Sequence, residues 1–503
     1  MLSFILIISI SGCATNQSKL GGSTDDKTLT IAQGADMVSF DIHNHNNTST
    51  EAIHTNMFDY LVKRDKNMQL QPDLATSWKQ INDKTMRFKL RKGVKFHNGD
   101  PFTANDVKFT LERVAKDGKL LDHPNYVQIK EVKVVDDYTV DIITNQPEPV
   151  LLNRVSRIAS GILPSKYIKE KGWDYFLKHP IGTGPYQFVE WNKGDRIVLK
   201  ANKNYFGSKP KWNKLIFRVI PEDSTRVAEL LSGDVDIAMN VPPEDWDRIN
   251  KNDQTYVAKS PSQRVMMLEV RQTKGTVTAN PKVREAIDLA IDKKTIVDSL
   301  FDGAATLTRT RVTPGNNGAN EDLYKKTLYD PEKAKQLLKE AGYGNGLTLH
   351  LSAPSGRYLK DKESAELIAS MLGKVGIKVK LDLLEWSRFS EKYSSKSFNE
   401  LFLIGFGNSM MDASNSLTNL KQAEAKGETD YVNPKTQRLL EKAEHNMNSD
   451  SRNKEYAEAQ ELIANDRPNI YLYQLDQVAG VKKNIKFTPR LDEMIYADDI
   501  TTK

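Results

Sequence analysis

The chain has 503 residues, 39% hydrophobic and 27% charged, with a net charge of +6. This length exceeds what one hydrophobic core normally serves, so we expect two or three domains of a soluble globular protein. The small basic excess is spread along the chain without a long Lys/Arg run, which argues against nucleic acid as a partner. A single cysteine excludes an internal disulfide and a cysteine-rich zinc site.

That cysteine, Cys13, follows a short apolar run from Leu2 to Ile10. A membrane-spanning helix needs about 20 apolar residues, so the run fits the apolar core of a secretory signal instead. The segment Ile10-Ser11-Gly12-Cys13 resembles the bacterial lipobox, although no Lys or Arg precedes the apolar run. The resemblance implies a signal peptide over 1–12, with Cys13 as the lipid-bearing first residue of the mature protein.

The residues after Cys13 divide into a tether and a folded body. Residues 13–27 are polar and rich in Gly, Ser and Thr, as in a flexible, lipid-anchored tether. Short strands and amphipathic helices then intermix, which predicts an α/β architecture with mixed sheets. We expect strands at 28–32, 86–90, 132–135, 139–143, 197–199, 215–220, 347–351, 377–381 and 401–404, and helices at 103–113, 224–231, 281–296, 330–342 and 361–375.

Motifs of catalysis are missing from the sequence. It contains no P-loop, no His-Glu-x-x-His helix and no Gly-x-Ser-x-Gly elbow. No carboxylate pair stands out as an acid/base dyad, and the only thiol is assigned to the anchor. We therefore predict a protein that is not an enzyme and carries no cofactor.

The histidines raise one alternative, a metal site. His43 and His45 lie two residues apart and His54 follows, and such a trio could bind a divalent ion. The polar neighbours Asn44 and Asn47 favour instead a hydrogen-bonding loop with exposed imidazoles.

A series of ordered motifs is more specific than any single one. They lie at 73–78, 91–107, 180–186, 202–207, 280–286, 329–334 and 374–379. In this order they resemble the peptide/nickel family of solute-binding proteins of ABC importers, known as family 5. The resemblance covers about residues 28–490, essentially the whole mature body, and is strongest to its dipeptide- and glutathione-binding branch.

The resemblance implies a two-lobed clamp of the periplasmic-binding-protein type II class, with an additional subdomain inserted in the first lobe. Lobe I would comprise 28–59, 184–266 and 476–503, the inserted subdomain 60–183, and lobe II 267–475. Ligand would bind in the cleft between the lobes, and hinge closure would bury it. The protein would be a monomer on the outer face of the membrane, as in a Gram-positive bacterium, serving ABC permease and ATPase subunits.

A zwitterionic peptide needs a cation and an anion at its two ends, because an unpaired buried charge costs several kcal/mol. The planar fork of an arginine suits the ligand carboxylate, and Arg357, with Tyr358 beside it, resembles the family's carboxylate-binding arginine. Asp412 resembles the aspartate that binds the ligand amine, although Ala413 and Ser414 depart from the family motif.

Four further residues complete the predicted ligand site. Gly405 and Phe406 belong to the glycine-rich loop that carries Asp412, and Trp386 matches a position that lines the cleft. Arg264 precedes the expected crossing between the lobes and could reach a second carboxylate. Two arginines and one aspartate would match the charges of glutathione, our ligand hypothesis beside di- and oligopeptides.

Two other functions stay open at this stage. Nickel-chelate binders share the fold, with His43, His45 and the pair Met410-Met411 as the features that would mark this function. A peptide sensor without a transport role would use the same clamp.

Overall fold

The computed structural model describes residues 27–45 and 47–503. Cys13 and most of the predicted tether therefore lie outside the described residues. The body is built on an 11-stranded mixed sheet in the order β15-β14-β16-β12-β17-β11-β1-β10-β9-β8, with β13 added on β17. Within the described residues, every helix is too short or too polar to cross a membrane. The predicted α/β class with mixed sheets is confirmed.

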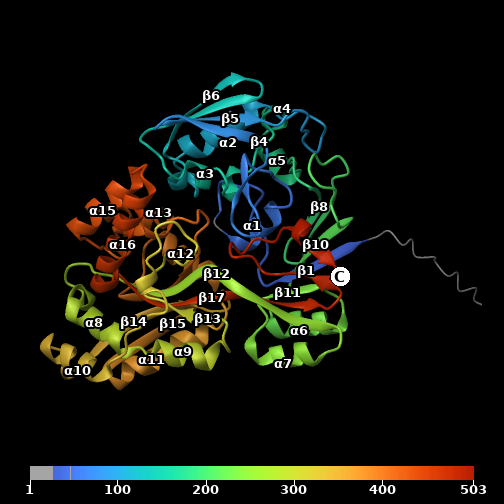
Figure 1. Cartoon of the computed structure of the whole chain (residues 1–503). Helices are drawn as coiled ribbons and strands as arrows, with labels where there is room; N and C mark the ends of the chain where they lie inside the picture. The colour runs from blue at the N-terminus through green and yellow to red at the C-terminus, as the bar shows by residue number, and fades with distance from the viewer. Residues whose placement is uncertain (1–26, 46) are drawn as a thin grey trace, which may run out of the picture.

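Two long strands connect the lobes. β12 (Thr255–Val270) and β17 (Asn469–Lys482) pair antiparallel over nearly their whole length. They run side by side from the lobe I side to the lobe II side of the molecule (Figure 1). Their register shifts between Pro261 and Val265 and again between Met266 and Met267. The predicted lobe boundaries, 266/267 and 475/476, fall inside these strands.

Lobe I packs around β1, which lies parallel to both β10 and β11. Alternate residues of β1, such as Leu29 and Ile31, are fully buried beside Phe217 of β10. The elements of this lobe are β1 (Thr28–Gln33), α1 (Thr48–His54), β8 (Tyr186–Asn192), β9 (Arg196–Ala201), β10 (Lys214–Val219), α6 (Asp223–Ser232), β11 (Ile237–Met239), α7 (Pro243–Lys251), β18 (Ile485–Lys486) and β19 (Thr501–Thr502).

The inserted subdomain is a separate antiparallel sheet in the order β4-β5-β7-β6, covered by α2, and it forms the top of Figure 1. The predicted cap of α2 is confirmed: Thr103 is the N-cap and forms a capping box with Asp106. Its elements are β2 (Val62–Arg64), β3 (Leu70–Pro72), β4 (Ala75–Asn82), β5 (Thr85–Leu90), α2 (Ala104–Lys116), β6 (Ile129–Asp136), β7 (Thr139–Thr144), α3 (Leu151–Arg154), α4 (Ser165–Lys171) and α5 (Trp173–Lys178).

Lobe II surrounds the β15-β14-β16 end of the large sheet with helices. The single helix predicted over 281–296 is wrong: Ile291 is extended, and Asp292 caps a second helix by accepting the Thr295 N–H. The elements are α8 (Pro281–Ala290), α9 (Lys293–Leu300), β13 (Ala305–Leu307), α10 (Pro331–Glu340), β14 (Leu347–Pro354), α11 (Asp361–Lys374), β15 (Ile377–Leu384), α12 (Trp386–Ser394), β16 (Leu401–Phe406), α13 (Ala413–Leu417), α14 (Gln422–Ala425), α15 (Pro434–His445) and α16 (Ser449–Asp466).

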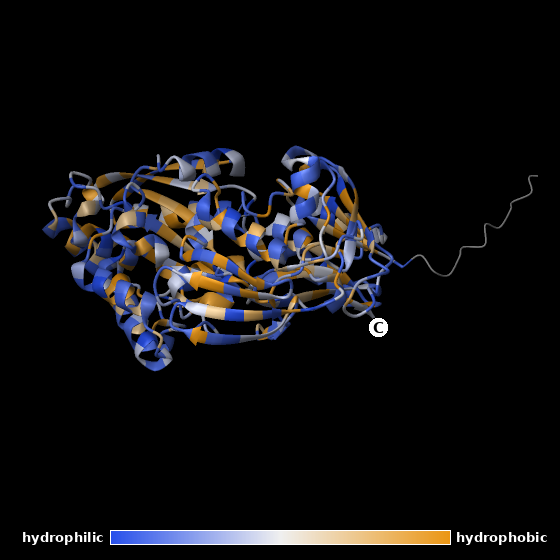
Figure 2. Cartoon of the chain, turned by 90° about the horizontal axis from the view of Figure 1, so that it is seen from above, coloured by the Kyte–Doolittle hydropathy of each residue, from blue (hydrophilic) through white to orange (hydrophobic). Residues whose placement is uncertain are grey.

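The remaining predicted helices and strands are present with small shifts of their ends. Apolar positions concentrate on the central strands, whereas the outer helices carry many hydrophilic residues (Figure 2). Lobe II alone contains two apolar clusters on opposite faces of β12, one with Leu268 and one with Met267. The side chains of this strand thus alternate between two cores.

Candidate functional site

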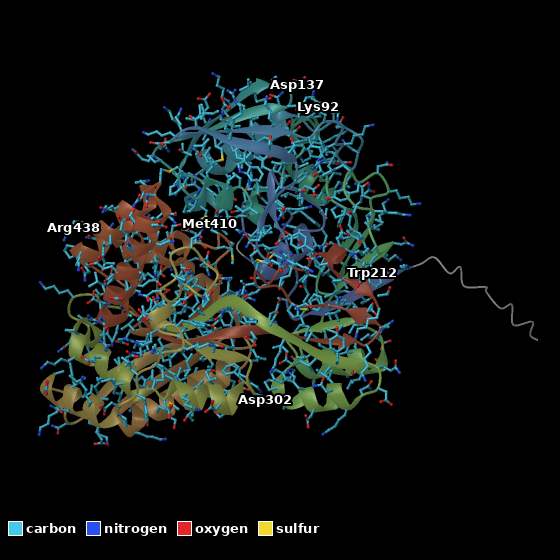
Figure 3. All side chains as sticks on the ribbon, in the orientation of Figure 1. Lys92, Asp137, Trp212, Asp302, Met410 and Arg438 are labelled. Atoms are coloured by element: carbon cyan, nitrogen blue, oxygen red, sulfur yellow. The ribbon has the colours of Figure 1, made fainter. Side chains whose placement is uncertain are left out.

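The segment after β16 is where lobe II meets the inserted subdomain. The carbonyl oxygen of Met410 accepts hydrogen bonds from Arg64 at 2.9 Å and from Asn153 at 2.7 Å. Arg157 donates to the Ser409 hydroxyl at 2.8 Å. Met410 lies in the middle of the molecule, between the two parts that it joins (Figure 3). Residues 405–410 therefore mark the lobe II wall of the interface in which the predicted site residues converge.

Arg357 stands on this wall in the loop between β14 and α11. The Asp361 carboxylate accepts the backbone N–H groups of Gly356, Arg357 and Tyr358, which fixes the loop. The guanidinium lies 5.3 Å from the ring centre of Tyr358 and 4.9 Å from that of Trp386. The predicted neighbours Trp386 and Tyr358 thus frame Arg357 by cation–π contact.

The half-buried guanidinium of Arg357 has no carboxylate partner within the described part of the chain. Its side chain makes no hydrogen bond there, and its Nε is buried without an acceptor. Burial, reinforced by the nearby Arg264, lowers the pKa of Arg357 from its ordinary value. A guanidinium that is fixed in position, partly removed from water and without a counter-ion is suited to bind an anion such as a carboxylate.

Arg264, on β12, is already neutralised. It donates to both oxygens of Glu493, at 3.0 and 2.6 Å, and also to the Gly405 carbonyl at 3.0 Å and to Thr48 at 3.2 Å. Although burial works against its charge, Glu493 raises the pKa of Arg264 above its ordinary value. Arg264 thus links the C-terminal segment of lobe I to the lobe II wall.

Gly405 and Phe406 form part of the same wall. The Gly405 carbonyl also accepts the Tyr358 hydroxyl at 3.1 Å. A Cβ on Gly405 would lie 2.5 Å from the Met266 sulfur, so only glycine fits between these groups. The half-buried Phe406 ring is covered by the Arg311 guanidinium at 3.9 Å.

Asp412 occupies a different environment from the one predicted. It is fully buried at the start of α13, and both of its oxygens accept from Arg452 of α16, at 2.8 and 2.6 Å. The Ser414 N–H and hydroxyl bind the same carboxylate. Its charge is therefore satisfied inside lobe II, and the departure noted at Ser414 supplies one of the partners.

Glu51, a half-buried carboxylate in the first turn of α1, was not singled out from the sequence. It has no hydrogen-bond or ion-pair partner among the residues that the structure describes. Burial, with a further contribution from Asp122, raises the pKa of Glu51 to about 7. No local motif marks this residue, because its environment is assembled from distant segments.

The charge pair Arg157–Asp122 was also missed from the sequence, and both of its members influence the pKa of Glu51. Arg157 donates to Asp122 at 3.0 Å within the inserted subdomain while its Nε reaches Ser409 of lobe II. Both partners are nearly fully buried. The interface thus contains the ion pairs Arg264–Glu493 and Arg157–Asp122. Among the described residues, Arg357 and Glu51 border it with neither a hydrogen bond nor an ion pair to their charged groups.

The predicted exposure of the histidines is wrong. His43 and His45 are buried, His43 beside Arg113 at 2.6 Å and His45 beside His54 at 3.4 Å. Burial lowers the pKa of all three rings. Across residues 27–45 and 47–503, no three His, Cys, Asp or Glu side chains are arranged to hold a metal ion.

A separate open cavity lies elsewhere. It has about 680 Å³ and lies over β8, β9 and β10, between side chains such as Lys200 and Lys214. Most of its lining residues are charged and stand on one flat sheet face, and none of the site residues above belongs to it. The site between the lobes is therefore defined by the side chains that meet there.

Comparison with known proteins places this arrangement in a family. Residues 69–428, well over half of the chain, match the model described as "Bacterial extracellular solute-binding proteins, family 5 Middle". The glutathione-binding protein GsiB of Shigella flexneri serotype 5b is 30% identical over 477 residues, covering 91% of each chain. GsiB of Salmonella choleraesuis is 29% identical, with the same coverage of both chains.

Solved structures agree over the whole body. The binding protein DppA of Helicobacter pylori, in complex with the peptide STSA, matches with a TM-score of 0.84 and 27% identity, over 94% of this chain and 98% of its own. NikZ of Campylobacter jejuni, in complex with Ni(L-His), matches with a TM-score of 0.82 and 26% identity, over 95% and 99%. These relatives are binding proteins rather than enzymes. The chain belongs to family 5 of the bacterial extracellular solute-binding proteins and has their two-lobed, type II clamp.

Proposed function

We propose that this protein captures a small zwitterionic peptide outside the cell, glutathione or a di- or oligopeptide, and delivers it to an ABC permease. The observation that carries the proposal is Arg357, a guanidinium in cation–π contact with Tyr358 and Trp386 that forms no ion pair with any residue the structure describes. A ligand carboxylate is the natural partner of such a group, since a bidentate, charge-assisted pair repays its desolvation. Gly405 and Phe406 would line the ligand on the same wall of lobe II.

The two relatives named for glutathione support that ligand in particular. Glutathione carries two carboxylates and one amine. Arg357 would take one carboxylate, and Arg264, which Glu493 already neutralises, would take the second only if Glu493 gave way. Binding of both glutathione carboxylates would therefore require the Arg264–Glu493 ion pair to open, whereas a peptide with one carboxylate would leave this pair intact.

The test is calorimetry on the purified protein with reduced glutathione, oxidised glutathione and short peptides. Arg357→Lys keeps the charge but removes the planar fork, so we expect affinity to fall about tenfold to hundredfold. Arg388→Lys, on the exposed side of α12, is the matched control and should bind as the wild type does. Equal affinities for Arg357→Lys and wild type would refute the role of Arg357, and peptide binding without glutathione binding would refute the narrower ligand.

Delivery and anchoring complete the proposal. A monomer tied to the outer face of the membrane by lipid on Cys13 would present its closed clamp to the permease. Cys13→Ala should shift the protein from the membrane fraction to the medium, and uptake of the ligand by cells should fall with it. Continued uptake in cells that lack the protein would favour a sensor.

The nickel-chelate alternative rests on the likeness to NikZ. The histidines that were predicted to mark nickel binding support it only weakly, because His43 and His45 are buried against other partners. Titration with Ni(L-His) separates this function from peptide capture.

A further inference from the structure

Asp412 leaves the ligand amine without its expected partner. Its two oxygens are held by Arg452, and no part of its side chain is exposed. Releasing it would leave Arg452, itself buried, as an unpaired cation, a state that costs several kcal/mol. The anion for a bound ammonium group therefore has to come from elsewhere.

Glu51 is placed to provide it. Arg264 and Arg157 both act on the Glu51 carboxylate, and each of them also bonds to lobe II, Arg264 to Gly405 and Arg157 to Ser409. Arg264 also donates to the hydroxyl of Thr48, which lies in the same first turn of α1 as Glu51. This turn of α1 therefore borders the predicted ligand site from the lobe I side.

The surrounding charges leave the carboxyl group of Glu51 without a counter-ion. Arg264 is neutralised by Glu493 and Arg157 by Asp122, at 2.6 and 3.0 Å, and the buried Tyr60 phenol also interacts electrostatically with Glu51. The Arg264–Glu493 pair also acts on Arg357. Arg357 and Glu51 therefore both lie within the electrostatic reach of one neutral pair.

We propose that Glu51, on α1 of lobe I, receives the ammonium group of the bound ligand while Asp412 holds lobe II together. The assignment rests on the proposed function and sharpens it: the ligand is one whose free amine and carboxylate span the distance from Glu51 to Arg357. Each lobe then supplies one charge, so that only a zwitterion bridges both. A ligand lacking either charge leaves one buried group unpaired.

Proton release follows from the same geometry. Without ligand, the high pKa of Glu51 keeps its carboxyl group protonated below about pH 7. When an ammonium group arrives, the O–H bond breaks, the carboxylate pairs with the cation and the proton passes to the buffer. Ligand binding at pH 6.5 should therefore release a proton, and affinity should rise with pH through this range.

The experiment is calorimetry with reduced glutathione, trialanine and the N-acetylated form of each, on wild type, Glu51→Gln, Asp412→Asn and the surface control Glu332→Gln. Wild type and Glu332→Gln should prefer the free amine by about tenfold to hundredfold. Glu51→Gln should lose this preference and still bind the N-acetylated ligands as wild type does. Titrations in phosphate and in Tris at pH 6.5 should give buffer-dependent heats with wild type and not with Glu51→Gln.

The outcomes separate the two proposals. A Glu51→Gln protein that keeps the wild-type preference, or loss of the preference in a folded Asp412→Asn protein instead, would overturn the assignment of Glu51. Absence of binding of every peptide to wild type would overturn the proposed function and the assignment together. Circular dichroism of each variant shows whether it is folded.

Discussion

Several buried charged side chains of this protein have an ion-pair partner. Asp412 has Arg452, Asp122 has Arg157, and Glu493 has Arg264, as expected for groups whose burial is costly without a partner. Arg357 and Glu51 have no such partner among the described residues, and both border the interface between the lobes. A perturbed charge at such an interface is a candidate for contact with a ligand.

The Asp412–Arg452 pair should contribute to stability rather than to ligand choice. Replacing Asp412 by Asn leaves a buried guanidinium without its anion, so we expect the free energy of unfolding to fall by about 3–5 kcal/mol. The control is Glu458→Gln, which breaks a half-exposed pair with Lys435 and should cost less than about 1 kcal/mol. Denaturant unfolding followed by circular dichroism measures both, and equal effects would contradict the structural role.

The raised pKa of Glu51 predicts that the stability of the protein depends on pH. Its pKa of about 7 in the folded chain lies above the ordinary value of 4.5, so folding favours the protonated form. This contribution is complete below about pH 4.5 and is lost as pH rises through 7. Glu51→Gln avoids the loss, so at pH 8 we expect it to be more stable than wild type by about 1–3 kcal/mol, and at pH 4.5 to match it. Thermal melts at the two pH values test this, and an equal difference at both would contradict it.

Among the elements, the segment Gly182–Gly184 joins the inserted subdomain to lobe I by a close approach of two backbone segments. The Gly184 N–H donates to the Met57 carbonyl at 2.9 Å, and a Cβ on Gly182 would lie 2.1 Å from the same oxygen. The sequence resembles the family in this segment, and the structure explains why glycine is needed there. The close approach leaves no room for a side chain.

Gly182→Ala should therefore destabilise the protein by about 2 kcal/mol or more, because neither backbone can retreat. Gly373 gives the matched control: it lies in the exposed last turns of α11, where an added Cβ would meet only open space. There, Gly373→Ala should stabilise by about 0.5–1 kcal/mol. Opposite signs in denaturant unfolding support the interpretation, and destabilisation by both would contradict it.

Sequence patterns were enough to predict those structural elements that neighbouring residues determine. The Thr103 cap, the helix between Asp330 and Gly342 and the strand pair around Asp136 were all predictable from neighbouring residues. Helical periodicity continued across Ile291, so the break at the Asp292 cap was missed. Glu51 and the pair Arg157–Asp122 had no local signal, because their environments combine segments hundreds of residues apart.

At the scale of the whole molecule, few polar contacts hold the lobes together. Three of these contacts are the hydrogen bonds that Arg64, Asn153 and Arg157 donate to residues 409–410. Two others are the ion pair of Lys360 with Glu244 at 2.7 Å and the hydrogen bond between His445 and the Pro147 carbonyl at 3.1 Å. Such contacts are each worth about 1 kcal/mol. A clamp closed by them can reopen, as release of a captured solute requires.

Removing one of them should shift the clamp toward its open form. Asn153→Ala deletes the donor to Met410, so we expect ligand affinity to fall about threefold to tenfold and the radius of gyration without ligand to rise. Asn145→Ala, whose side chain bonds only to the Val127 carbonyl of the same subdomain, is the control. Calorimetry and small-angle X-ray scattering give the two readouts, and unchanged values for Asn153→Ala would refute the role of this contact.

The position of β17 also fixes the order in which the chain can assemble. This strand begins at Asn469, and it pairs with β12, β11 and β13 at the centre of the sheet. A nascent chain therefore lacks the middle of both lobes until more than nine tenths of it has been synthesised. The central pairing of both lobes therefore depends on the last strand of the large sheet to be synthesised.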